Sequence, residues 1–210
     1  CASMCKCAPE DIIHCNGLRA LPGEIAASSV SLNLSNNYLW ILTTNTFRNL
    51  TFLHSLWLDG NNLTFLSPGT FHALSKLREL HLSRNSRLTY LHANTFRGLL
   101  SLISLDLSHY NIFETHLLLF SHLPSLERLD LASNNRRYVP QAFRNLSSLP
   151  RLSLEGSHTE AIGRDSLKDL ETLNLYLNNH QISLISDSAF SYLNKLHFLH
   201  LRKNNLSSLP

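Results

Sequence analysis

Two aspartates and a histidine recur at nearly equal spacing in the middle of the chain. His81 precedes Asp106 by 25 residues, and Asp130 follows Asp106 by another 24. If the chain folds as a regular repeat of this length, the three side chains lie on neighbouring strands about 4.8 Å apart. Two adjacent carboxylates can bind a cation or share a proton, so the elements that hold them decide what they can do.

Familiar catalytic motifs do not accompany these residues. The sequence contains no GxSxG, HExxH, GxxxxGK[ST] or GxGxxG motif. His197 and His200 are the closest histidine pair, but residues three apart on a strand face opposite sides, which makes a poor metal site. We therefore expect a protein that is not an enzyme and that holds no cofactor and no metal ion.

The stretch from Leu53 to Leu82 shows which elements position these side chains. It reads LHSLWLDGNNLTFLSPGTFHALSKLRELHL, and its leucine slots reopen 24 residues later. Such a period indicates a solenoid and matches the leucine-rich repeat pattern LxxLxLxxNxL, in which LxxLxLxx forms a short parallel strand. Successive repeats start 23–25 residues apart, at Ser29, Leu53, Leu77, Leu102, Leu126 and Leu149. The last complete repeat starts at Leu196.

We therefore predict an α/β-class leucine-rich repeat solenoid with a curved, parallel concave β-sheet, a mostly irregular convex side and few helices. Residues 1–28 form an N-terminal cysteine-rich cap, and residues 29–210 form about seven or eight repeats, the last incomplete. Because no closing cap precedes Pro210, we expect the natural protein to continue beyond this fragment.

Two other columns recur with the leucines. An asparagine slot can satisfy the backbone of the turn between coils, and a phenylalanine slot should be buried on the convex side. Tyr110 and Ser157 replace the asparagine, and Asn85–Leu88 carries one extra residue. The slots hold Asn37, Asn61, Asn85, Asn134 and Asn204, and Phe47, Phe71, Phe96, Phe120, Phe143 and Phe190.

The register between residues 162 and 182 is ambiguous. Leu170, Leu173 and Leu175 could carry the strand, or Leu173, Leu175 and Leu177 could. We prefer the first set, with Asn178, Asn179 and His180 competing for the asparagine slot. This choice places Asn174 in the central concave position.

The residues between the strand leucines face the concave surface. Its central slot is predicted to hold Asn33, Trp57, His81, Asp106, Asp130, Ser153, Asn174 and His200. An open sheet offers no water-excluding pocket, which disfavours catalysis and favours contact with a macromolecule. A Trp in mid-strand is typical of protein-interface hot spots, although it could also lie over its neighbours. The predicted ligand-binding residues are Trp57, Asp59, His81, Arg84, Asp106, Arg128, Asp130, Arg151 and Glu155.

Composition narrows the class of partner. The net charge is +3 with both signs interspersed, and no basic block suggests a nucleic-acid partner. Hydrophobic residues make up 43% of the chain, yet no apolar run reaches the roughly 20 residues that cross a bilayer. Membrane attachment would need an anchor outside this fragment, and the oligomeric state stays open.

The four cysteines, Cys1, Cys5, Cys7 and Cys15, all lie in the first fifteen residues. Such a cluster at a chain end indicates a disulfide clasp and an oxidising compartment, with three possible connectivities. A zinc knuckle is the alternative, but its paired CxxC spacing is missing. No apolar segment precedes Cys1, so we expect a signal peptide to have been cleaved or left out.

Five sequons fit a secreted or cell-surface chain, although Asn-Leu-Ser/Thr arises easily in a repeat rich in Asn and Leu. A glycan on Asn33, which we place on the concave face, would restrict ligand binding near the cap. Glycans on Asn49 and Asn145, which we place in the outer arc, would obstruct little. The predicted glycosylation sites are Asn33, Asn49, Asn62, Asn145 and Asn205.

The cap and repeats resemble the extracellular leucine-rich repeat superfamily, and the layout is most similar to the Nogo receptor family. The resemblance rests on the four cysteines, GLRALPGEIAAS near the cap, SLWLDGN at residues 55–61, the insertion after Asn85 and the NNLSSLP ending. It implies the pairs Cys1–Cys7 and Cys5–Cys15. It also implies a glycosylated, membrane-anchored ectodomain that binds protein ligands and signals through co-receptors.

These observations predict non-catalytic protein recognition by an extracellular chain, either at the cell surface or secreted, through the concave face. Two alternatives stay open. One is an innate immune or antigen receptor, which would bind microbial ligands. The other is a secreted matrix-binding protein without a membrane anchor.

Overall fold

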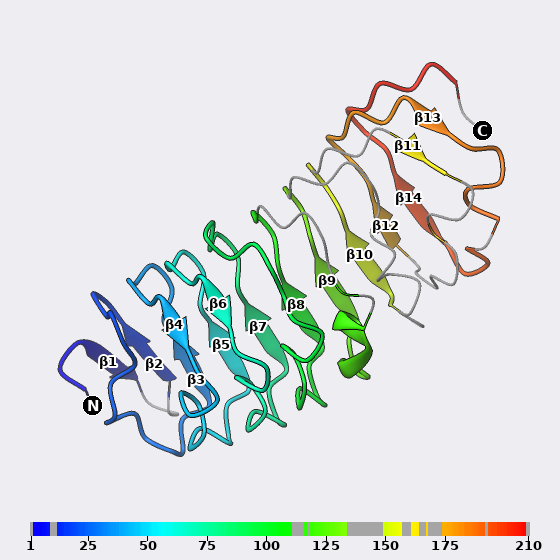
Figure 1. Ribbon diagram of the computed structural model, residues 1–210. Coiled ribbons are helices and arrows are strands. Elements are labelled where there is room, and N and C mark those ends of the chain that lie inside the picture. The colour runs from blue at the N-terminus through cyan, green and yellow to red at the C-terminus, as the bar shows by residue number, and fades with distance from the viewer. Residues whose placement is uncertain are drawn as a thin grey trace.

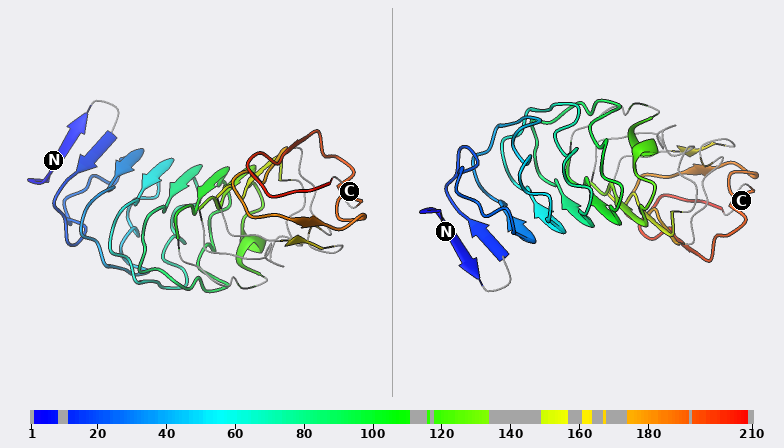
Figure 2. Two further views of the ribbon diagram at one scale, coloured as in Figure 1. Left: turned by 90° about the horizontal axis from the view of Figure 1, so that it is seen from above. Right: turned by 90° about the horizontal axis from the view of Figure 1, so that it is seen from below.

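The computed structural model describes residues 2–8, 12–110, 116, 118–133, 149–156, 161–163, 167, 174–191 and 193–208. The chain winds as a curved solenoid with its N-terminus at one end and its C-terminus at the other (Figure 1). Each coil contributes a short strand to one wall, and the loops that return the chain form the opposite wall (Figure 2). The predicted solenoid is confirmed.

The strand wall is a ten-stranded sheet. β1 and β2 are antiparallel, and every later neighbour pair is parallel. The order therefore follows the chain, as it must when each coil stacks on the one before it. The strands are β1 (Cys5–Ala8), β2 (Ile12–Cys15), β3 (Ser31–Asn33), β5 (Ser55–Trp57), β7 (Glu79–His81), β8 (Ser104–Asp106), β9 (Arg128–Asp130), β10 (Arg151–Ser153), β12 (Asn174–Tyr176) and β14 (Phe198–His200).

The opposite wall is mostly irregular. It carries two small parallel sheets, β4 (Ile41–Leu42) with β6 (Phe65–Leu66) and β11 (Ala161–Ile162) with β13 (Leu184–Ile185). The 3₁₀ helix η1 (Leu119–His122) is the one helix within the described residues. No described helix has the length and apolar character to cross a membrane.

A leucine in the middle of each concave strand from β3 onward builds the spine of the solenoid. The strand registers align these leucines in one row, and they are almost completely buried up to β12, whereas Leu199 in β14 is half-buried. Each such side chain contributes roughly 1.5–3 kcal/mol by leaving water. The row consists of Leu32, Leu56, Leu80, Leu105, Leu129, Leu152, Leu175 and Leu199.

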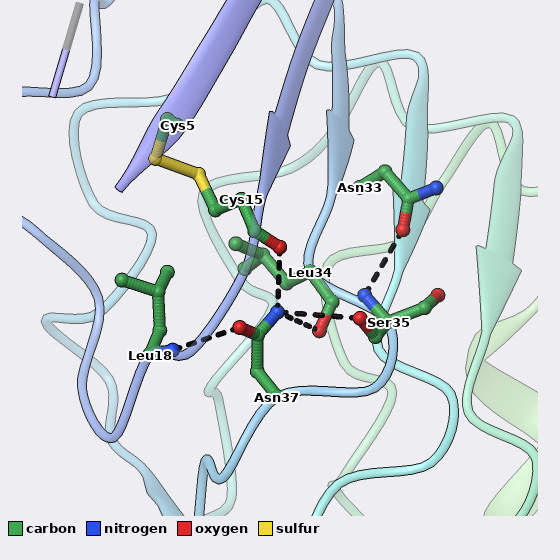
Figure 3. Close-up of a disulfide and its surroundings, with 7 residues drawn as sticks. All are labelled: Cys5, Cys15, Leu18, Asn33, Leu34, Ser35 and Asn37. Carbon is green, nitrogen blue, oxygen red and sulfur yellow. Dashed lines mark hydrogen bonds between the residues drawn. A yellow bond between two sulfur atoms is a disulfide. The ribbon is translucent and has the colours of Figure 1, made fainter. Parts of the chain in front are cut away.

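The asparagine slot performs the turn-satisfying role expected of it. The Asn37 amide donates to the carbonyls of Cys15 and Leu34, and its oxygen accepts from the Leu18 N–H at 2.8 Å (Figure 3). Asn61, Asn85 and Asn204 repeat this arrangement in later coils. Asn134 and Ser157 lie outside the described residues.

The cap covers the first coil. β1 and β2 form a hairpin joined by the predicted Cys5–Cys15 disulfide, and β2 pairs with β3 so that Ile13 covers Leu32 (Figure 3 shows the disulfide). Cys7 is also disulfide-bonded, and its predicted partner Cys1 lies outside the described residues.

The preferred register for the seventh concave strand is wrong. Leu175 aligns with Leu152 and Leu199, so it takes the middle leucine slot of LxxLxLxx, and Leu177, just after β12, takes the last. Both are completely buried, and the buried His180 follows in the asparagine slot. The central concave position is therefore Tyr176 and not Asn174. Leu170 and Leu173 lie outside the described residues.

Aromatic rings fill the convex side of the core. Phe47, Phe71 and Phe96 stack in succession with ring centroids 6.0 and 6.4 Å apart. Phe120 is also buried, Phe190 is only half-buried, and Phe143 lies outside the described residues. Tyr110, which replaces the asparagine in its coil, is buried as well, so the larger ring is accommodated without leaving the core.

Candidate protein-binding face

The concave face consists of the side chains that flank the spine leucines. Strands alternate their side chains, so the residues before and after each leucine project from the sheet. The central column, after the leucine, holds Asn33, Trp57, His81, Asp106, Asp130, Ser153, Tyr176 and His200. The column before the leucine holds Ser31, Ser55, Glu79, Ser104, Arg128, Arg151, Asn174 and Phe198.

Trp57 is half-buried on this face because it stacks on the neighbouring coil. Its ring lies parallel to the imidazole of His81, with centroids 5.4 Å apart and an interplanar angle of 6°. His81 also contacts carboxylates on two sides. Its Nε2 is 2.5 Å from Glu79 Oε1, and its Nδ1 is 3.8 Å from Asp106 Oδ2.

These contacts set the charge of the imidazole. Burial opposes the charged form of His81, but the nearby Asp106 carboxylate, the hydrogen bond to Glu79 and the charge of Asp59 outweigh burial, so the pKa of His81 is raised. Burial also opposes the charge of Asp106, yet the nearby His81 imidazole and the hydrogen bond from the Ser108 N–H prevail and lower the pKa of Asp106. The cluster therefore favours an imidazolium ion against a carboxylate.

Asp106 and Asp130 lie side by side in register, as their spacing predicts. Each turns one carboxylate oxygen back to its own chain, where it accepts a hydrogen bond from the N–H two residues later at 2.9 Å. Burial raises the pKa of Asp130, the N–H of Ala132 opposes this, and the charge of Asp106 adds to it. No group of three or more metal-binding side chains occurs within the described residues.

Asp59 lies two residues beyond Trp57, where its carboxylate contacts the next coil. It accepts hydrogen bonds from the N–H and the hydroxyl of Ser83, at 2.7 and 2.9 Å. Burial raises the pKa of Asp59, although these hydrogen bonds oppose the change. At the other end of the molecule, the side-chain oxygen of Asn178 likewise accepts a hydrogen bond from the N–H of Arg202 in the next coil. Such side chains join coils and have less capacity left for a ligand.

The C-terminal half of the face has a different character. Arg128 and Arg151 are neighbours in register, and both are exposed. The Arg151 guanidinium lies 4.5 Å from the ring centroid of Tyr176. Tyr176 in turn stacks on His200 with centroids 4.2 Å apart. Phe198, beside this stack, is 61% exposed.

The remaining predicted contact residues lie at the rim. Arg84 occupies the left-handed turn that follows the strand, at φ 56°, and His109 takes the same position one coil later at φ 57°. Both side chains are exposed. Glu155 accepts a hydrogen bond from the Asn178 amide at 2.8 Å, so it also joins coils.

Comparison with known families explains this geometry. The family model described as "Leucine rich repeat" matches residues 28–86, 51–113, 75–135 and 105–158, which together span more than half of the chain. The chain belongs to the leucine-rich repeat family. Its parallel strands, leucine spine and asparagine slot are the structural form of that repeat.

Relatives place this leucine-rich repeat chain among extracellular proteins. Mouse podocan is 35% identical over 84% of this chain and 26% of its own length. Chicken keratocan is 31% identical over 99% of this chain and 59% of its own length. The crystal structure of human 5T4, also titled trophoblast glycoprotein, has a TM-score of 0.84 at 27% identity and covers 98% of this chain and 82% of that one. The chain thus spans between about a quarter and three fifths of the length of these two curated relatives.

Sequence reasoning missed part of the C-terminal leucine-rich repeat surface. The preferred register placed Asn174 in the central column, so the sequence analysis did not predict Tyr176 there. It therefore also missed the stack in which Tyr176 lies between Arg151 and His200. Phe198 was overlooked because it precedes the spine leucine of β14 in a column that is elsewhere polar. A hydrophobic residue in a column otherwise filled by Ser, Glu, Arg and Asn was the available signal.

Proposed function

We propose that the concave face binds a protein ligand through two clusters of opposite charge. The acidic cluster consists of Glu79, His81, Asp106 and Asp130 beside Trp57. The basic cluster consists of Arg128 and Arg151 beside Tyr176 and His200. A ligand with a cationic group over the first cluster and a carboxylate over the second would be held in one orientation.

The arrangement of aromatic rings among charged groups is the observation that carries this proposal. Trp57 and Tyr176 are each held flat by a stacked histidine, which fixes their orientation before a ligand arrives. Trp, Tyr and Arg are the residue types enriched at interface hot spots, and rigid rings lose little entropy on binding. A sheet open along its length suits a macromolecular surface better than a small substrate, which favours a binding protein over an enzyme.

The setting of this recognition is part of the proposal. A cell-surface protein of the kind the Nogo receptor resemblance implies would be anchored outside residues 1–210 and would signal with co-receptors. Podocan and keratocan are leucine-rich repeat proteins of the extracellular matrix. The similarity of this chain to them favours a secreted matrix-binding protein as the second candidate. The two candidates differ in where the full protein is found. A cell-surface protein stays on the cell that makes it, whereas a secreted matrix-binding protein enters the medium.

Charge reversal on matched surfaces tests the binding face. Fluorescent tetramers of the secreted protein are applied to a panel of cell lines and to deposited matrix, and bound fluorescence is measured. We expect Arg128→Glu and Trp57→Ala each to reduce capture at least tenfold, which corresponds to about 1.4 kcal/mol. Thermal stability should stay nearly unchanged for both.

Arg97→Glu is the matched control, since Arg97 is exposed on the outer arc and the change in charge is the same. It should leave capture unaltered. Equal losses for Arg97→Glu and Arg128→Glu would show that net charge, and not the concave face, governs binding. Loss of stability with unchanged capture for Trp57→Ala would remove that residue from the site.

A further inference from the structure

A second surface feature lies away from the concave sheet. A depression of about 420 Å³, large enough for a sugar-sized ligand, is lined by Arg19, Tyr38, Trp40, Asn62 and Arg87. Tyr38 is 59% exposed and Trp40 57% exposed. Two large rings exposed in one depression form an apolar patch of the kind that marks an interaction site.

Backbone hydrogen bonds bring these residues together from successive coils. The Tyr38 N–H donates to the Leu18 carbonyl at 2.7 Å, which places Tyr38 beside Arg19. The Asn62 N–H donates to the Leu39 carbonyl at 2.8 Å, between the two aromatic residues. Arg87 is added from the third coil, in the turn that carries the one-residue insertion after Asn85.

Asn62 begins the sequon Asn62-Leu63-Thr64. The side chains of Asn62 and Thr64 are both exposed, and neither is needed by the asparagine slot, which Asn61 fills. Asn33, by contrast, is half-buried, and its amide oxygen accepts a hydrogen bond from the Ser35 N–H. Asn62 is therefore the more accessible acceptor of the two.

We propose that Asn62 carries an N-linked oligosaccharide whose first sugars lie in this depression, against Tyr38 and Trp40. In the attachment step, the Asn62 amide nitrogen bonds to C1 of the first N-acetylglucosamine. The lipid pyrophosphate of the donor leaves, and the amide loses one proton. The C–H face of the sugar packs on the electron-rich ring faces. Arg19 and Arg87 donate hydrogen bonds to its hydroxyl and acetyl oxygens.

Asn205 provides a control within the same chain. It begins the sequon Asn205-Leu206-Ser207, and its N–H donates to the Ile182 carbonyl just as the Asn62 N–H donates to Leu39. The two acceptors thus occupy equivalent places in the solenoid. Gln181 and Ser183 stand where Asn62 has Tyr38 and Trp40, so a glycan on Asn205 has no aromatic platform.

Fluorescence of Trp40 tests the contact directly. The chain has two Trp, so Trp57→Phe leaves Trp40 as the sole reporter. Protein secreted from mammalian cells is compared with the same protein carrying Asn62→Gln, using acrylamide as a neutral quencher. Peptide mapping by mass spectrometry establishes occupancy. We expect the glycan to reduce the quenching constant of Trp40 by about half, because a sugar covers one of the two ring faces.

The result should persist after an endoglycosidase trims the glycan to its first sugar, since that sugar makes the contact. Asn205→Gln should leave the quenching constant unchanged. An unmodified Asn62, or equal quenching with and without its glycan, would overturn the proposal. Equal quenching would leave the depression free for a protein partner.

A thermal double-mutant cycle gives an independent measure. Asn62→Gln and Trp40→Ala are combined, and the melting temperatures of the four proteins are compared. We expect the glycan to raise Tm by about 2–4 °C when Trp40 is present and much less when it is absent. The corresponding cycle of Asn205→Gln with Trp40→Ala should be additive. Additivity in both cycles would contradict the proposal.

Discussion

Two stacks of an aromatic ring on an imidazole occupy equivalent slots at opposite ends of the concave face. The rings of Trp57–His81 and of Tyr176–His200 are nearly parallel, with interplanar angles of 6° and 5°. Their surroundings differ: Glu79 and Asp106 flank His81, whereas Arg151 lies over Tyr176. The same backbone position therefore yields an acidic end and a basic end. The repeat supplies the geometry, and the variable residues between the leucines supply the chemistry.

The leucines beneath the two stacks also differ in exposure. Leu80 beneath the first stack is completely buried between Leu56 and Leu105, while Leu199 beneath the second is only half-buried. Equivalent substitutions at the two ends test whether these differences in charge and burial affect stability and binding.

The largest expected difference concerns the spine. Leu80→Ala should lower the free energy of unfolding by about 3 kcal/mol, because it leaves a cavity in a tightly packed row. Leu199→Ala should cost clearly less, since part of that side chain is already in water. Denaturant unfolding of both variants checks this. Equal costs would show that the C-terminal end is packed as tightly as the middle.

The next effect concerns the side chains that join coils. Asp59→Ala removes the carboxylate oxygen that accepts both hydrogen bonds from Ser83 and should cost about 1–2 kcal/mol, whereas Asp59→Asn retains an acceptor oxygen and should cost less. Asn178→Ala makes the equivalent change at the other end. Thermal unfolding and ligand capture are measured together. If Asp59→Asn abolishes capture without loss of stability, Asp59 belongs to the ligand site after all.

The smallest effect distinguishes the two histidines. The pKa of His81 is raised in the folded protein, so its contribution to stability is fully present below the unfolded pKa of about 6.5. That contribution is lost as the pH rises through the folded pKa. The stability advantage of the native chain over His81→Gln should therefore shrink from pH 5.5 to pH 8, by less than about 1 kcal/mol for a partly exposed cluster.

His200→Gln is the comparison, because no carboxylate forms an ion pair with His200 in the described part of the chain. Unfolding free energies at several pH values should show no comparable trend for that variant. Parallel trends would mean that the carboxylates around His81 do not control its protonation.

Much of this molecule could be predicted from its period. The spine leucines, the asparagine slot, the Cys5–Cys15 disulfide implied by family resemblance, and the adjacency of His81, Asp106 and Asp130 all appear as expected. The strict spacing of apolar residues determines all of these except the disulfide, because a coil that shifts by one residue would expose its leucines to water. The ligand-binding and glycosylation residues stay predictions.

Tertiary structure decided what the period left open. The spacing left two sets of leucines for the strand near residue 175, and the preferred set, Leu170, Leu173 and Leu175, was wrong. Packing between Leu152 and Leu199 places Leu175 in the spine and brings Tyr176 to the concave face. Tertiary structure also turned the Asp59 carboxylate to Ser83 and brought Trp40 beside Asn62. Such contacts join residues about one coil apart, and they depend on the shape of each loop, which hydrophobic spacing does not specify.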